Sequence, residues 1–310
     1  MAHAAAMPAP AAHRFDRTDL ALYAATVFLW GTSWFALKAQ LGVVAPEVSA
    51  LWRFILAAAI MWGWAALARA PLRFGPADHA RFLATGACLF SINFTLFYYG
   101  GLTVPSGLLA VVFSLASIFN LVLGAVLLRQ RIEPRVALGG LVGAAGIGLL
   151  FWPEIARTGA SAAGAGGALA GLALCVAGTL FFCLGNMVST LVQRRGVPLL
   201  SANAWGMTYG TGILLAISLA RGQTFTVEPT LVYASAILYL AVGASVMAFA
   251  CYLTLLRRIG AARAGYSTVL FPVVALAIST VLEGYLWTPA AALGVALALA
   301  GNVLVLTRNA

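Results

Sequence analysis

Long apolar runs, separated by short polar segments, follow one another along almost the whole chain. Each run holds about 20 mainly apolar residues, the length that an α-helix needs to cross roughly 30 Å of hydrocarbon. The runs are continuously apolar and do not alternate with a period of two, so they predict helices rather than the strands of a barrel. We expect ten spanning helices, over residues 20–41, 46–68, 80–99, 103–128, 135–153, 168–192, 199–219, 232–256, 263–282 and 288–306.

The composition agrees with an all-α integral membrane protein. Hydrophobic residues make up 63% of the 310 residues, charged residues make up only 8%, and the mean hydropathy is +0.99. A soluble domain carries roughly 25% charged residues to cover its surface. The composition therefore excludes a soluble enzyme, a disordered chain and a disulfide-built secreted module.

The net charge of +10 would suggest nucleic-acid binding in a soluble protein, but its distribution indicates a different origin. If the N-terminus is cytoplasmic, the inner segments hold fourteen of the 18 Lys and Arg residues. These are Arg14, Arg17, Arg69, Arg73, Arg81, Arg129, Arg131, Arg135, Arg194, Arg195, Arg257, Arg258, Arg263 and Arg308. Such a bias is typical of the cytoplasmic loops of membrane proteins. We expect a multi-pass protein of the cell (inner) membrane with both termini cytoplasmic and no nucleic-acid partner.

The ten runs divide into two sets of five. Pro134 with Gly139 and Pro289 with Gly294 occupy equivalent places before the last span of each set. Because five is odd, the second set must enter from the opposite side, which predicts two inverted five-helix repeats. The expected divisions are a flexible cytoplasmic tail (1–19), a first repeat (20–153), a Gly/Ala-rich external linker (154–167), a second repeat (168–306) and a cytoplasmic C-terminus (307–310).

Four stretches carry a family resemblance: WGTSWF at 30–35, LWRF at 51–54, the turn at 101–108 and IGAARAGYSTVLFP at 259–272. With this topology, the chain resembles the drug/metabolite transporter superfamily with two EamA-type halves. It is most similar to YddG-type exporters of aromatic amino acids. The resemblance implies a secondary transporter with a central cavity and alternating access. One departure is that the Gly-Glu pair common at the ends of spans four and nine is replaced by Arg129-Gln130 and Glu283-Gly284.

Aromatic and neutral polar residues inside the spans are the candidates for substrate binding, because an amphiphilic solute needs apolar walls and a few hydrogen-bonding groups. For each Asn the alternative is a hydrogen bond between helices, and for Tyr98 and Tyr99 it is the interfacial aromatic belt. The candidates are Trp30, Ser33, Asn93, Tyr98, Tyr99, Asn120, Asn186, Trp205, Tyr209, Ser245 and Tyr252, with Trp34 beside them in the first span.

Ionisable residues inside a span usually mark function, and the chain offers only Lys38 and Arg53, near the outer ends of the first two spans. Either they extend to the lipid headgroups, or they face an outward vestibule where Arg53 attracts a carboxylate. No Asp or Glu is expected inside the spans to relay protons. This favours facilitated efflux or exchange over proton antiport driven by a carboxylate.

Pro and Gly indicate the moving parts. Pro105 and Gly107 stand at the start of the fourth span, and Pro272 interrupts the ninth. A proline inside a helix removes a hydrogen bond and kinks it. We expect these residues to act as hinges when the fourth and ninth spans bend.

The sequence thus predicts an exporter of small amphiphilic metabolites, with amino acids and in particular aromatic ones favoured. The alternatives are an exporter of other metabolites or drugs of the same superfamily, and a membrane-embedded enzyme, for which the spans lack a catalytic set. There is no phosphate-binding loop, and His3, His13 and His79 lie outside the spans. We expect no cofactor and no metal. The expected partners are the small-molecule substrate and the lipid bilayer, and either a monomer or a dimer fits.

Overall fold

The computed structural model describes residues 16–128, 134–158, 162–259, 264 and 266–306, and the regular elements in these segments are all helices. Most of the expected tail, the Arg129-Gln130 pair and residues 307–310 lie outside them. The first half contains α1 (Arg17–Lys38), α2 (Pro46–Leu67), α3 (Pro76–Ala87), η1 (Cys88–Ile92), α4 (Asn93–Gly101), α5 (Ser106–Phe113), α6 (Ala116–Leu128) and α7 (Pro134–Thr158). The second contains α8 (Ala162–Arg194), α9 (Leu199–Ala220), α10 (Leu231–Leu238), η2 (Tyr239–Met247), α11 (Ala248–Ile259), α13 (Ser267–Leu282) and α14 (Pro289–Leu306).

Ten helical passes correspond to the ten expected spans. The third pass is α3, η1 and α4 in succession, the fourth is α5 with α6, and the eighth is α10, η2 and α11. Seven of the passes are long and apolar enough to cross a bilayer by length and composition, and α13 and α14 are shorter apolar helices. The remaining pass, α9, has 22 residues, but polar residues such as Asn203 and Thr208 lower its mean hydropathy.

Helical structure extends into two segments that the sequence assigned to irregular chain. In the expected tail, Asp16 caps α1: it accepts a hydrogen bond from Asp19 N–H at 2.8 Å, and Asp19 Oδ2 accepts one from Asp16 N–H at 3.1 Å. In the expected linker, α7 continues to Thr158 and α8 begins at Ala162. Alanine is the strongest helix former, which explains why an Ala-rich connection is helical.

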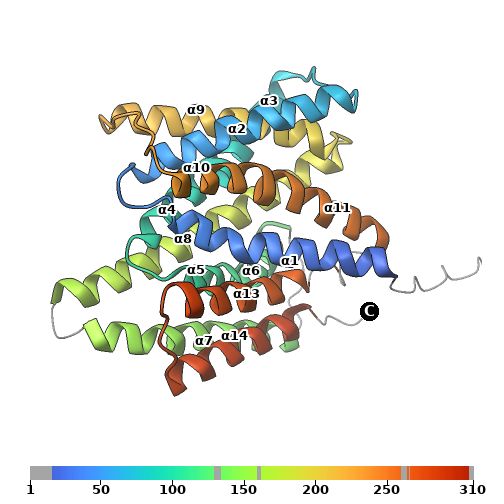
Figure 1. The fold of residues 1–310 in the computed structure, drawn as a ribbon. Helices are drawn as coiled ribbons and strands as arrows, with labels where there is room; N and C mark the ends of the chain where they lie inside the picture. The colour runs from blue at the N-terminus through green and yellow to red at the C-terminus, as the bar shows by residue number, and fades with distance from the viewer. Residues whose placement is uncertain (1–15, 129–133, 159–161, 260–263, 265, 307–310) are drawn as a thin grey trace, which may run out of the picture.

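The two halves pack against each other through reciprocal contacts between helices at equivalent positions. The first helix of each half contacts the fourth pass of the other half, as α1 with α13 and α8 with α5 and α6. Helices at the same position also pair, as α2 with α9 and α7 with α14. Figure 1 shows α1 and α8 running in opposite directions, and α7 and α14 side by side at one edge. The two halves therefore contact each other through equivalent helices.

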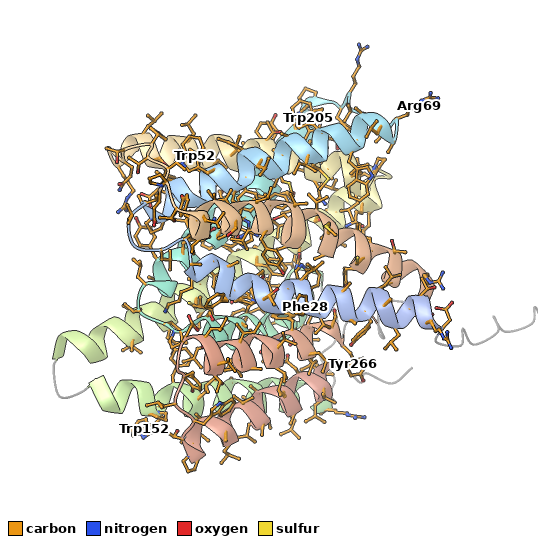
Figure 2. The ribbon with its side chains drawn as sticks, in the orientation of Figure 1. Phe28, Trp52, Arg69, Trp152, Trp205 and Tyr266 are labelled. Atoms are coloured by element: carbon orange, nitrogen blue, oxygen red, sulfur yellow. The ribbon has the colours of Figure 1, made fainter. Side chains whose placement is uncertain are left out.

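The outer surface of the bundle carries large apolar side chains. Phe28 is 59% exposed and Trp152 is 65% exposed, and both lie on the outside in Figure 2. In water such a surface would promote association. The same surface suits a bilayer, where lipid tails cover apolar side chains.

An ion-pair cluster ties α1 to α11 at one end of the bundle. Arg258 Nε lies 2.5 Å from Asp19 Oδ1, and Arg258 Nη2 lies 2.7 Å from Asp16 Oδ2. The hydrogen bond to Asp19 raises the pKa of the Arg258 guanidinium above its ordinary value. The start of the first helix is therefore held against the end of the eighth pass.

Glycines allow α7 and α14 to approach closely. A Cβ added at Gly301 would lie 2.5 Å from Gly139 O and from Gly143 N. A Cβ added at Gly146 would lie 2.5 Å from Ala298 N and 2.6 Å from Gly294 O. No side chain larger than a hydrogen fits at these contacts without separating the helices.

Replacing Gly146 by Ala should lower the melting temperature of the purified protein in detergent, because overpacking of this kind costs typically about 1–3 kcal/mol. The matched control is Gly148→Ala on the same helix, where an added Cβ meets nothing within 4 Å. Equal melting temperatures for the two variants would contradict the described contact between α7 and α14.

Candidate functional site

A cavity of about 620 Å³ lies inside the bundle and is lined by both halves of the chain. This volume is within the range of roughly 300–1,000 Å³ that is typical of small-molecule sites. Eleven of its 32 lining residues are aromatic, and Trp34 packs against Phe97 and Phe113 with ring centroids 5.1 and 5.3 Å apart. The aromatic lining residues are Trp30, Trp34, Phe54, Phe90, Phe94, Phe97, Phe113, Phe182, Phe249, Tyr252 and Phe271.

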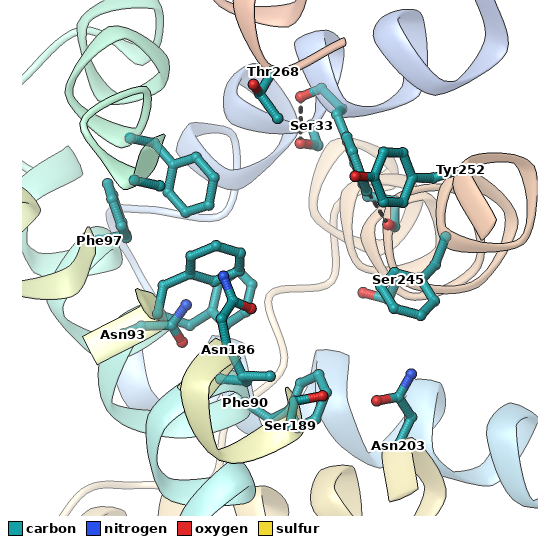
Figure 3. Close-up of a pocket in the computed structure, with 18 of the residues that line it drawn as sticks. Ser33, Phe90, Asn93, Phe97, Asn186, Ser189, Asn203, Ser245, Tyr252 and Thr268 are labelled. Atoms are coloured by element: carbon teal, nitrogen blue, oxygen red, sulfur yellow. Dashed lines mark hydrogen bonds between the residues drawn. The ribbon is translucent and has the colours of Figure 1, made fainter. Parts of the chain in front are cut away.

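Neutral polar side chains interrupt the aromatic wall. Figure 3 shows the carboxamides of Asn93 and Asn186 pointing into the open centre, with Ser245 and Tyr252 across from them. The polar lining residues are Ser33, Asn93, Ser114, Ser117, Asn120, Asn186, Ser189, Thr190, Gln193, Asn203, Ser245 and Thr268. In the part of the chain that the structure describes, no Asp or Glu lines the cavity.

The cavity reaches the end of the bundle where α1 begins. Its lining includes Gln193 in the last turn of α8, Asn203 in the second turn of α9 and Val305 near the end of α14. These helix ends and the start of α1 lie at the same end of the bundle in Figure 1. A solute can approach from this end.

Arg53 stands at the other end of the cavity, on α2. Its side chain is only 5% exposed, and Nη2 donates a hydrogen bond to Ser245 Oγ at 3.2 Å. The guanidinium carbon lies 4.3 Å from the ring centroid of Phe94 and 5.1 Å from that of Phe54, and Tyr98 is a further polar neighbour. Arg53 Nε has no hydrogen-bond partner. Over the described residues, no carboxylate forms an ion pair with it.

Beyond Arg53, side chains of the first half close the bundle. The Tyr98 hydroxyl donates to Gln40 Oε1 at 2.5 Å, and the Tyr99 hydroxyl donates to Glu47 Oε2 at 2.7 Å. Glu47 is fully buried and also pairs with Arg221, from the end of α9, at 2.9 Å. The contact between Glu47 and Arg221 therefore joins the two halves at this end.

A second carboxylate, Glu283, joins the halves at the same end. Its Oε2 accepts hydrogen bonds from Ser106 N–H at 3.0 Å, Ser106 Oγ at 2.6 Å and Ser279 Oγ at 2.5 Å. Ser106 is the first residue of α5, so a carboxylate of the second half caps a helix of the first. Negative charge at a helix N-terminus is stabilising.

The structure brings eight of the predicted residues to the cavity. They are Trp30, Ser33, Arg53, Asn93, Asn120, Asn186, Ser245 and Tyr252. Trp30 packs against Tyr252 with centroids 5.1 Å apart and the rings tilted by 46°, and its Nε1 donates to Ala244 O at 3.3 Å. An indole held in this way is not an interfacial anchor.

Five predicted residues do not line the cavity. Tyr98 and Tyr99 belong to the closed end described above, and Lys38 Nζ donates to Val104 O at 2.8 Å there. Trp205 and Tyr209 lie elsewhere, against His79: the Trp205 and His79 centroids are 4.5 Å apart, and the Tyr209 hydroxyl is 3.0 Å from His79 Nδ1. Tyrosine and tryptophan were expected at the cavity because they combine an apolar ring with a polar atom. The same combination also allows them to join helix ends, and these residues do so here.

The predicted hinge residues occupy packed positions in this conformation. Pro105 precedes the first turn of α5, and a Cβ at Gly107 would lie 2.9 Å from Leu276 Cα on α13. Pro272 is buried inside α13. The observed break in the fourth pass comes later, at Ser114 and Leu115 between α5 and α6.

Irregular helix geometry coincides with the cavity. The break after α5 places Ser114 in the wall, the π-helical η1 contributes Leu89 and Phe90, and the π-helical η2 contributes Ala244 and Ser245. A π-helical turn inserts a residue, redirects side chains and is frequent at functional sites. Because of these irregularities, polar groups and rings that a regular helix would direct elsewhere face the cavity.

The sequence did not single out the Phe residues of the wall or Glu47, and it distinguished Glu283 only as part of a departure from the family pattern. Phe113 and Phe182 have ring centroids 4.6 Å apart inside the protein, whereas Phe28 faces outward, and the hydropathy of the three is the same. Glu47 and Glu283 stand at the ends of apolar runs, where a charge is expected in a loop. Only the way the helices pair in the fold shows which of these Phe residues face the cavity and which carboxylates join the two halves.

Comparison with known proteins identifies the family. Residues 18–152 and 169–307 each match the EamA-like transporter family. The chain belongs to this family. The two matched segments correspond to the two halves of the fold, so this EamA-like transporter contains two repeats.

This EamA-like transporter is also similar to individual proteins and to a solved structure. It is 24% identical over 262 residues to protein PagO of Salmonella typhimurium (strain LT2), covering 83% of this chain and 82% of that protein. It is 30% identical over 105 residues to an uncharacterised transporter of Buchnera aphidicola, covering 34% and 35%. A solved crystal structure shares the fold with a TM-score of 0.62 and 18% identity, over 94% of this chain and 96% of that one.

Replacing Tyr98 by Phe should lower the melting temperature of the purified protein more than the same change at Tyr99. Tyr98 is fully buried, so its loss leaves Gln40 Oε1 without a donor, which costs about 1–3 kcal/mol. Tyr99 is half-buried, and water can replace its hydroxyl. A Tyr99→Phe variant that is less stable than Tyr98→Phe would refute this account of the closed end.

Proposed function

We propose that this EamA-like transporter exports small amphiphilic metabolites, most favourably amino acids with aromatic side chains, by alternating access through the central cavity. The observation that carries the proposal is a buried guanidinium, Arg53, at the end of an aromatic cavity and without a carboxylate partner among the described residues. The resemblance to YddG-type exporters points to the same substrates.

The chemistry of the cavity supports a carboxylated aromatic substrate. Removing an ion from water costs several kcal/mol unless the ion is paired, so a buried guanidinium favours an anionic ligand. Arginine binds carboxylates through two parallel hydrogen bonds, and Arg53 Nε is available for one of them. The rings around Trp34 and Phe113 would cover an aromatic side chain.

The direction of access follows from the charge distribution. The end to which the cavity extends carries the start of α1 and the exposed Arg194 and Arg195 after α8. Arginine-rich ends face the cytoplasm, so this conformation would receive substrate from the cytoplasm, and the contacts of Glu47 and Glu283 would close the outer end. Because two oppositely oriented repeats can exchange their conformations, the same fold can also open outward.

The energy source that fits this cavity is the substrate gradient. The carboxylates of Glu47 and Glu283 lie beyond Arg53, at the closed end, and not on the cavity wall. We therefore favour facilitated efflux or exchange. Export of other metabolites or drugs of the superfamily is the alternative, and a cationic drug would be repelled by Arg53.

Replacing Arg53 by Gln should lower the counterflow of labelled phenylalanine in proteoliposomes by at least about tenfold, because a charge-assisted hydrogen bond contributes about 1.5–3 kcal/mol. Arg53→Lys keeps the charge and should retain intermediate activity. Arg73→Gln, in the exposed loop between α2 and α3, is the control and should transport normally. The proposal fails if no amino acid moves above empty liposomes, or if Arg53→Gln transports as well as Arg73→Gln.

The cavity should be open to the cytoplasm in the resting protein. With the four native cysteines replaced by Ala, a cysteine at Ser189 in the cavity should react with a membrane-impermeant maleimide in inverted vesicles. A cysteine at Thr224, exposed in the loop after α9, should react only in right-side-out vesicles. Labelling of both positions from the same side would contradict the proposed orientation and opening.

A further inference from the structure

Two buried carboxamide oxygens at the cavity have no hydrogen-bond partner. They are Oδ1 of Asn93, on α4, and Oδ1 of Asn120, on α6. Asn93 is only 1% exposed. Buried polar atoms are nearly always hydrogen-bonded, so unpaired acceptors in a cavity indicate a ligand that supplies donors.

The two asparagines differ in this respect from Asn302. The Oδ1 atom of Asn302 accepts a hydrogen bond from Ser117 Oγ and joins α14 to α6. Asn302 is thus an example of an asparagine that connects helices. The Oδ1 atoms of Asn93 and Asn120 make no such connection within the described residues, which leaves them free for a solute.

Asn93 and Arg53 line the same cavity. Oδ1 of Asn93 is an unpaired acceptor, and Nε of Arg53 is an unpaired donor. The cavity therefore offers a solute one positively charged donor and one neutral acceptor.

We propose that the cavity selects zwitterions: the substrate carboxylate binds Arg53, and the substrate ammonium donates to Oδ1 of Asn93, with Asn120 as a second acceptor. This inference rests on the proposed function. An ammonium has three donors, and a carbonyl oxygen can only accept. A plain carboxylate would neutralise Arg53 but leave both oxygens unpaired, whereas an amine without a carboxylate would be repelled by the guanidinium.

The test compares phenylalanine with 3-phenylpropionate, which has the same ring and carboxylate but no ammonium, in counterflow through the full-length protein. In Asn93→Leu, which keeps the side-chain size, phenylalanine counterflow should fall by about tenfold, and 3-phenylpropionate counterflow should change by less than about twofold. Asn186→Leu removes another cavity carboxamide, whose oxygen is not among the unpaired atoms. This control should change both substrates by the same factor.

The outcomes separate this inference from the function on which it rests. If the wild-type protein moves no amino acid, the proposed function is wrong. If phenylalanine moves and Asn93→Leu changes both substrates equally, the transporter stands and zwitterion selection is refuted. Should Asn93→Leu fail to fold, competition against labelled phenylalanine in the wild type decides: 3-phenylpropionate should compete at least about tenfold more weakly than phenylalanine, and equal competition overturns the inference.

Discussion

A guanidinium inside a membrane protein is stable only if its surroundings replace the water that it has lost. Arg53 has a hydroxyl, two phenyl rings and a neighbouring tyrosine around it, and no carboxylate among the described residues. Charge transfer into a medium of low dielectric is costly unless the charge is paired. Neutral polar groups and aromatic rings surround this unpaired charge in the cavity, and under the proposed function a solute would supply the anion.

The fold creates the cavity by combining very tight and very irregular packing. Glycines let the backbones of α7 and α14 touch, and this contact fixes the two helices relative to each other at one edge of the bundle. The π-helical segments η1 and η2 and the break at Ser114 interrupt regular packing in the middle. At one end, Glu47 with Arg221 and Glu283 with Ser106 hold the halves together across their interface. Such polar contacts can be exchanged for water, which the proposed alternating access would require at this end.

Much of this architecture could be predicted from the sequence, because lipid restricts what a chain can do. Continuous apolar runs give the spans, and the positions of the arginines suggest the sides of the membrane. Asn93 and Asn186 could be expected at a cavity, since an amide facing lipid is costly. Phe113 and Phe182 could not, because a phenyl ring is equally stable against lipid, as Phe28 shows. The π-helical turns were also missed, since an inserted residue leaves the hydropathy of a run unchanged. Tyr98 and Trp205 were assigned to the cavity because their spacing does not reveal that Gln40 and His79 are their partners.

The most direct test of the central claim, that Arg53 awaits the anion of a small solute, is a structure determined in lipid nanodiscs with phenylalanine present. The account predicts density in the cavity with a carboxylate in hydrogen-bonding contact with Arg53 and the ring among Trp34, Phe97 and Phe113. A protein carboxylate or a lipid phosphate bound to Arg53, with the cavity otherwise empty at saturating phenylalanine, would contradict it.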